Sequence, residues 1–194
     1  MPQRLADFVN IVFAVVIAQS LARYSDELLD PSWPPRIIVG LLVVYFTTVS
    51  SWWGYHRSLA DYPYKQSVDG ILRFTFDALT VILYVYLVYS VREIEESGHL
   101  LRYIYGFPLI FLAYLGSGLL RRREYDERAS VPRLLLLWGV LSAIAAGSYN
   151  LLYWGYPAHM DVWNWLFIGI PLIVVAGFRL HRARYYSSLG EAQT

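Results

Sequence analysis

Six apolar segments, each about as long as a bilayer is thick, constrain this chain more than any other feature. A helix needs about 20 mostly apolar residues to cross a hydrocarbon core of about 30 Å. The segments are separated by charged or proline-rich breaks, and they lie near residues 5–23, 36–55, 70–91, 101–120, 132–154 and 162–180. We therefore expect an all-α, polytopic membrane protein in which residues 1–194 form a single domain of six transmembrane helices.

The composition supports a membrane protein and excludes several other classes. Hydrophobic residues make up 57% of the chain and charged residues 16%, whereas soluble domains carry about 25% charged residues. The chain has no cysteine, so it has neither disulfides nor a thiolate metal site. Its net charge of +1 gives no general attraction to nucleic acid.

Charges between the segments predict the orientation. Lys and Arg favour the cytoplasmic side of short loops. With the N-terminus inside, twelve of the 16 Lys and Arg residues fall on the cytoplasmic side and four on the other. We therefore expect both termini in the cytoplasm and a multi-pass protein of the cell inner membrane.

A cleaved signal peptide is the competing interpretation of the first segment. Its amino-terminal region carries one basic residue, Arg4, and Asn10 interrupts the apolar run. Both features favour a membrane span.

Small and β-branched residues form a stripe on one face of the first segment, at the spacing of neighbouring helical turns. Such a face can pack closely against other helices or line a narrow axis. The stripe consists of Ile11, Val15, Ala18 and Ala22.

Polar residues within the spans gather in the predicted cytoplasmic halves. Arg73 and Asp77 are four residues apart, so they share a helix face and can form a self-neutralising ion pair. The alternative is a cluster between helices, in which Arg4, Asn10 and His56 join Asp77 and hold the first three helices together. Both interpretations remain open at this point.

The sequence carries no sign of catalysis or of a bound cofactor. No histidines or carboxylates stand at a metal-ligand spacing, and there is no phosphate-binding glycine loop or nucleophile elbow. We expect a protein that is not an enzyme, with no metal or other cofactor.

Two short stretches carry a family resemblance. In the first, Arg4 and Phe8 stand four residues apart and precede the apolar run Val-Phe-Ala-Val-Val-Ile of residues 12–17; the second reads Trp53-Gly-Tyr-His56-Arg57. They resemble the lysosomal potassium channel family and its bacterial single-repeat relatives. In that family, Arg-x-x-x-Phe-Ser-Asp begins the first helix and Trp-x-x-His-His ends the second.

The chain departs from this signature at two places. Val9-Asn10 stands in place of Ser-Asp, and Arg57 in place of the second histidine. Asn10 can form hydrogen bonds but cannot neutralise Arg4, so Asp77 becomes the candidate for that role.

The resemblance implies a homotetrameric channel for potassium or other monovalent cations, with helix one lining a central pore. The pore would be narrowed by apolar side chains, and Val15, near the middle of the span, would form the constriction. One rival is a non-conducting scaffold or partner-binding protein that retains the fold, which Val9-Asn10 favours. Another is a solute or proton pathway inside the subunit, which a cavity ending at Asp77 or His56 would favour.

Overall fold

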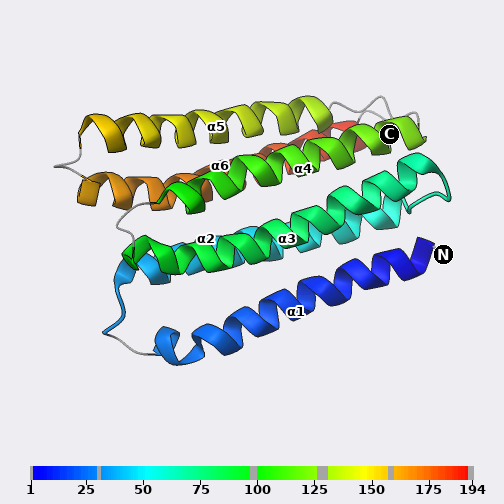
Figure 1. Cartoon of the computed structure of the whole chain (residues 1–194). Coiled ribbons are helices and arrows are strands. Elements are labelled where there is room, and N and C mark those ends of the chain that lie inside the picture. Colours follow the sequence, from blue (N-terminus) through cyan, green and yellow to red (C-terminus); the bar gives the residue numbers. More distant parts are fainter. Residues whose placement is uncertain (1, 30–31, 97–99, 126–130, 157–159, 192–194) are drawn as a thin grey trace.

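The computed structural model describes residues 2–29, 32–96, 100–125, 131–156 and 160–191 (Figure 1). These residues form six α-helices and no strand. In chain order the helices are α1 (Pro2–Leu29), α2 (Pro35–Asp61), α3 (Val68–Glu96), α4 (Leu101–Tyr125), α5 (Val131–Gly155) and α6 (Met160–Glu191).

Each predicted span lies within one of these helices, so the all-α fold class is confirmed. All six helices of the described residues are long and apolar enough to cross a membrane. Most extend several residues beyond the apolar core read from the sequence. Hydropathy marks only the hydrocarbon-embedded part, whereas the backbone ladder continues into the interfaces, where water satisfies the terminal groups.

Local sequence explains where α2 and α3 begin. Pro35 occupies the first turn of α2, where its missing N–H costs no hydrogen bond. The backbone N–H of Gly70 donates to Ser67 Oγ over 3.1 Å, so Ser67 caps α3. The intervening loop therefore turns the chain sharply enough for α2 and α3 to pack together.

The helices run roughly along one direction, and α1 begins at the end of the bundle where α6 ends (Figure 1). We call this the terminal end. It also holds the α2–α3 loop, whereas α2 begins at the opposite end. The beginning of α1 and the end of α6 therefore lie on the same side of the bundle, as an even number of crossings requires.

Two helices, α1 and α5, lie at the edges of the bundle. Within the described residues α1 contacts α2 and α3 alone and α5 contacts α4 and α6 alone, whereas the other four helices each contact three neighbours. In Figure 1, α1 accordingly lies at the edge of the bundle. All six helices contribute side chains to the main core, whose fully buried residues include Leu41, Tyr84, Leu87 and Phe107.

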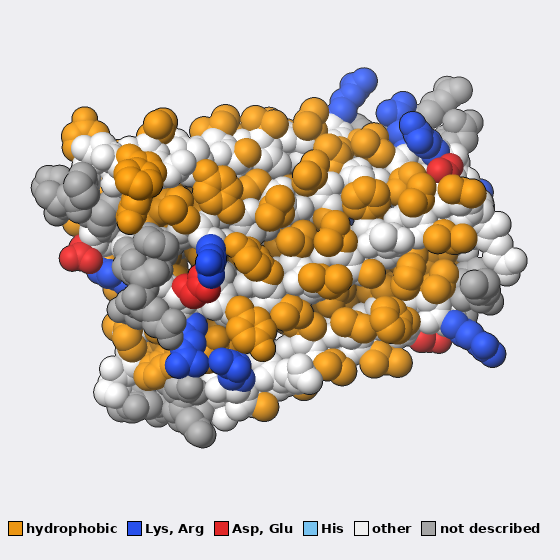
Figure 2. All heavy atoms as spheres, in the orientation of Figure 1, with side chains coloured by type: hydrophobic (Ala, Val, Ile, Leu, Met, Phe, Trp, Pro, Cys, Tyr) orange, Lys and Arg blue, Asp and Glu red, His pale blue; other side chains and the backbone are white. Residues whose placement is uncertain are grey.

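The surface shows the distribution expected of a membrane protein. In the view of Figure 2, hydrophobic side chains cover the middle of the bundle, and Lys, Arg, Asp and Glu gather toward its two ends. An apolar belt between charged ends matches a bilayer, whose core cannot solvate charge. The fold is that of a multi-pass α-helical membrane protein.

Candidate functional site

The two faces of α1 have opposite environments. Five residues at helical spacing pack against the bundle and are buried: Val9, Phe13, Val16, Ser20 and Tyr24. At about 100° per residue, the predicted stripe lies on the opposite side of the helix.

All four residues of the stripe face outward from the subunit. Ile11 is 62% exposed and Val15 44% exposed, and Ala18 and Ala22 are also exposed. The stripe therefore does not contribute to the interior of its own bundle. That it lines a pore stays a prediction.

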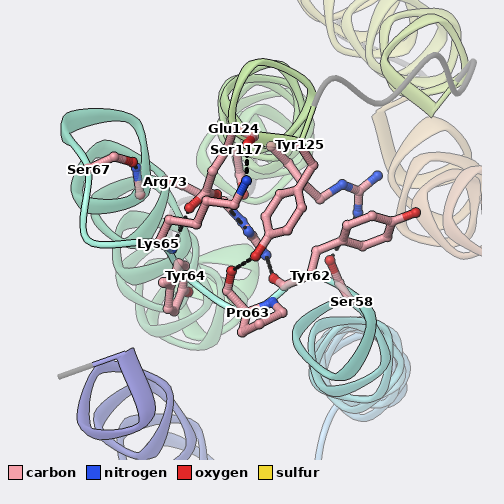
Figure 3. A network of polar contacts seen from close by, with 12 residues as sticks. Ser58, Tyr62, Pro63, Tyr64, Lys65, Ser67, Arg73, Ser117, Glu124 and Tyr125 are labelled. Atoms are coloured by element: carbon pink, nitrogen blue, oxygen red, sulfur yellow. Dashed lines mark hydrogen bonds and ion pairs between the residues drawn. The ribbon is translucent and has the colours of Figure 1, made fainter.

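A buried ion pair lies at the terminal end, where α3 meets the end of α4 (Figure 3). Arg73 Nη1 lies 3.0 Å from Glu124 Oε2, and the two side chains are 2% and 1% exposed. Arg73 Nη2 also donates to the carbonyl oxygen of Tyr62 over 2.7 Å, and its guanidinium lies 4.9 Å from the ring centre of Tyr64. The arginine thus joins α3, α4 and the α2–α3 loop.

The predicted pair between Arg73 and Asp77 is wrong. Asp77 instead accepts hydrogen bonds from Tyr64 Oη and Ser117 Oγ, each over 2.7 Å. The two residues do share a face, but α4 supplies Glu124 next to that face. Arg73 therefore pairs with Glu124, and hydroxyl groups satisfy Asp77.

The predicted cluster of Arg4, Asn10, His56 and Asp77 forms only in part. Arg4 and His56 are exposed, and no hydrogen bond or ion pair joins Arg4 to Asp77 in the described residues. Asn10 and His56 do line one pocket of about 480 Å³ between α1 and α2, and Tyr64 also borders it.

Tyr64 connects that pocket to Asp77. Its hydroxyl donates to the carboxylate and lies 3.2 Å from the hydroxyl of Tyr55. Burial, together with the nearby carboxylate, raises the pKa of Tyr64 well above its usual range. The residue therefore remains a neutral hydrogen-bond donor. Its place in the loop, after Pro63, gave no sequence signal for this role.

A second, smaller cavity of about 70 Å³ borders Asp77 inside the bundle. Its volume is sufficient for a few water molecules. Serine, tyrosine and arginine side chains line it with Asp77, among them Ser51, Tyr114, Ser117, Arg121 and Arg179. Toward the opposite end of the bundle, the buried residues Leu41, Leu87 and Val88 belong to the apolar core.

Phe8 and Trp53, two aromatic residues of the motif stretches, lie outside the core. Phe8 is 53% exposed, and its ring centre lies 6.0 Å from that of Phe74 on α3. Trp53 is 72% exposed on α2. Both side chains are therefore open to the surroundings of the subunit.

The residues described by the structure include no group of three His, Asp or Glu side chains placed to hold a metal ion. Comparison with family models, with curated proteins and with solved structures found no match to this chain.

Proposed function

We propose that the protein is an oligomeric cation channel in which the α1 stripe of each subunit faces a common axis. The exposure of Ile11, Val15, Ala18 and Ala22 on a helix at the edge of the bundle carries this proposal. An axis between subunits can be lined only by a face that its own subunit leaves open. The motif resemblance supports potassium or another monovalent cation as the permeant ion and four as the number of subunits.

The stripe has the chemistry of a hydrophobic constriction. A ring of apolar side chains resists wetting, so an ion that passes it must give up part of its hydration shell. Val15 has the central position, one turn from Ile11 and one turn from Ala18. The departure at Val9 also fits this arrangement, because Val9 is completely buried against the bundle and does not face the axis.

Cation flux in proteoliposomes tests the proposal. Val15→Thr replaces one methyl group with a hydroxyl group at nearly the same side-chain volume, so it should ease wetting and increase flux. Val140→Thr is the matched control, because Val140 is 48% exposed on α5 and lies outside the stripe. Equal responses of the two variants would place the pore elsewhere, and absence of flux in every variant would favour a non-conducting scaffold.

The cavity beside Asp77 favours a second candidate, a proton or small-solute pathway within each subunit. It brings a carboxylate, hydroxyl groups and room for water together inside the bundle. In this case, Asp77→Asn should abolish transport and Val15→Thr should leave it unchanged. The channel proposal predicts the reverse: Val15→Thr should change the flux more than Asp77→Asn does.

A further inference from the structure

A groove of about 790 Å³ lies between α2 and α6. It combines two kinds of surface. Along α2 it is apolar, with the exposed side chains of Leu42, Phe46, Val49 and Trp53 at successive helical turns. This stripe is separate from the α1 stripe.

Three arginines border the groove at its terminal end. Arg57 follows Trp53 by one turn of α2, and α6 supplies Arg179 and Arg182. The groove is therefore apolar over most of its length along α2 and positively charged at its terminal end, where the three guanidinium groups lie.

Arg179 provides the strongest indication that an anion belongs here. It lies within a membrane-spanning segment, and its Nη2 donates to Ser51 Oγ over 2.9 Å. Its Nε is buried without a hydrogen-bond partner, and it forms no ion pair with a carboxylate of the described residues. A charge at this depth is costly unless a counter-charge compensates it.

Gly54 allows Arg179 to approach α2 closely at this point. A β-carbon at Gly54 would lie 2.4 Å from Nη1 of Arg179, whereas its 3.5 Å distance from Nη1 of Arg182 would be an ordinary contact. The absence of a side chain thus lets the guanidinium group of Arg179 approach the backbone of α2. Arg179 and Arg182 border the inner cavity as well as the groove.

We propose that this groove binds an anionic phospholipid. The phosphate group contacts Arg179, Arg182 and Arg57, and an acyl chain lies along the apolar side chains of α2. Leu42 and Arg57, at the two ends of the groove, are 15 residues apart, or about 22 Å along the helix. That length exceeds the roughly 15 Å of hydrocarbon in one leaflet, so it accommodates an acyl chain.

Charge and shape together favour a lipid over other occupants. A free phosphate ion would use the arginines but would leave the apolar part of the groove uncovered. A second copy of the chain would cover the apolar part but would have to bring a negative group to the arginines. An anionic phospholipid satisfies both parts, and basic pockets between helices at the cytoplasmic side are suited to such headgroups.

Mass spectrometry of the intact detergent-solubilised protein tests the proposal. The probes are phosphatidylglycerol and phosphatidylcholine with identical acyl chains. The wild-type protein should retain phosphatidylglycerol in preference to phosphatidylcholine. Arg179→Gln and Arg182→Gln should each weaken this preference about fivefold, the effect of one basic residue near a lipid headgroup.

Two further variants provide the controls. Gly54→Ala should also weaken phosphatidylglycerol retention, because the added methyl group displaces the flexible end of Arg179. Arg133→Gln removes an exposed arginine of α5 that does not line the groove, so it should have no effect. Reading the ratio of the two lipids keeps the experiment valid if a variant is less stable.

Three results would overturn the proposal. The first is equal retention of the two lipids by the wild-type protein. The second is full competition by inorganic phosphate, which would indicate a site for a small anion. The third is a change in oligomer size with Trp53→Ala while lipid retention stays constant, which would identify the groove as a contact between copies of the chain.

Discussion

Arg73 of α3 and Glu124 of α4 form an ion pair of 3.0 Å between two side chains that are almost completely buried. They are 51 residues apart in the sequence. Glu124 also accepts a hydrogen bond from the backbone N–H of Lys65, so the carboxylate holds the α2–α3 loop as well. At the terminal end of the bundle, one carboxylate thus accepts hydrogen bonds both from α3 and from the α2–α3 loop.

Removing that carboxylate should be strongly destabilising. Glu124→Gln leaves the guanidinium of Arg73 buried without its counter-charge, which costs about 3–5 kcal/mol. Thermal unfolding in detergent measures the loss. Asp161→Asn is the control, because Asp161 pairs with Arg36 at the surface and its side chain is 88% exposed. The exposed pair should contribute at most about 1 kcal/mol to the free energy of unfolding. Equal losses of stability in Glu124→Gln and Asp161→Asn would contradict a special role for the buried pair.

Gly70 should not tolerate a side chain. A β-carbon there would lie 2.1 Å from the carbonyl oxygen of Lys65 and 2.9 Å from Glu124 Oε1. Gly70→Ala must therefore move the loop backbone away from α3, and we expect a loss of about 1–3 kcal/mol in the free energy of unfolding.

Gly147 provides the matched control for this substitution. A β-carbon at Gly147, within α5, would meet no atom within 4 Å. Gly147→Ala should be neutral, or should stabilise the protein by up to about 1 kcal/mol through helix propensity. A destabilisation by Gly147→Ala as large as that by Gly70→Ala would show that backbone contact with the loop is not the cause.

The carboxylate of Asp77 should stabilise the protein through the two hydrogen bonds that it accepts from hydroxyl groups. Asp77→Ala leaves the Tyr64 and Ser117 hydroxyls without this acceptor, at a cost of about 1–3 kcal/mol. Asp77→Asn keeps one acceptor oxygen and should cost less. Chemical denaturation of both variants beside Asp61→Ala, which removes an exposed carboxylate, gives the comparison. If Asp61→Ala lowers the free energy of unfolding as much as Asp77→Ala does, the hydrogen bonds from the two hydroxyl groups are not the cause.

The orientation predicted from loop charge can be tested by cysteine labelling, because the chain has no cysteine of its own. Ser32 and Gln66 are exposed and lie in connections at opposite ends of the bundle. With both termini in the cytoplasm, Ser32→Cys should react with an impermeant maleimide in intact cells. Gln66→Cys should react only after the cells are opened, and the opposite pattern would invert the topology.

The number and approximate positions of the spans follow from the sequence because the bilayer acts on each segment separately. A run of about 20 apolar residues must satisfy its own backbone by forming a helix. Turn signals such as Pro34, Pro35 and Pro63 fall in or beside the connections. The common face of Ile11, Val15, Ala18 and Ala22 likewise follows from helical periodicity alone.

The partners of the polar side chains were decided only by the tertiary structure. Spacing within α3 made Asp77 the nearest candidate for Arg73, but α4 brings Glu124 to the guanidinium and Ser117 to Asp77. The same is true of Gly54, whose missing side chain matters only because α6 places Arg179 against it. Hydropathy and periodicity act along one helix, whereas a buried charge pairs with whichever group the packing of other helices brings within reach.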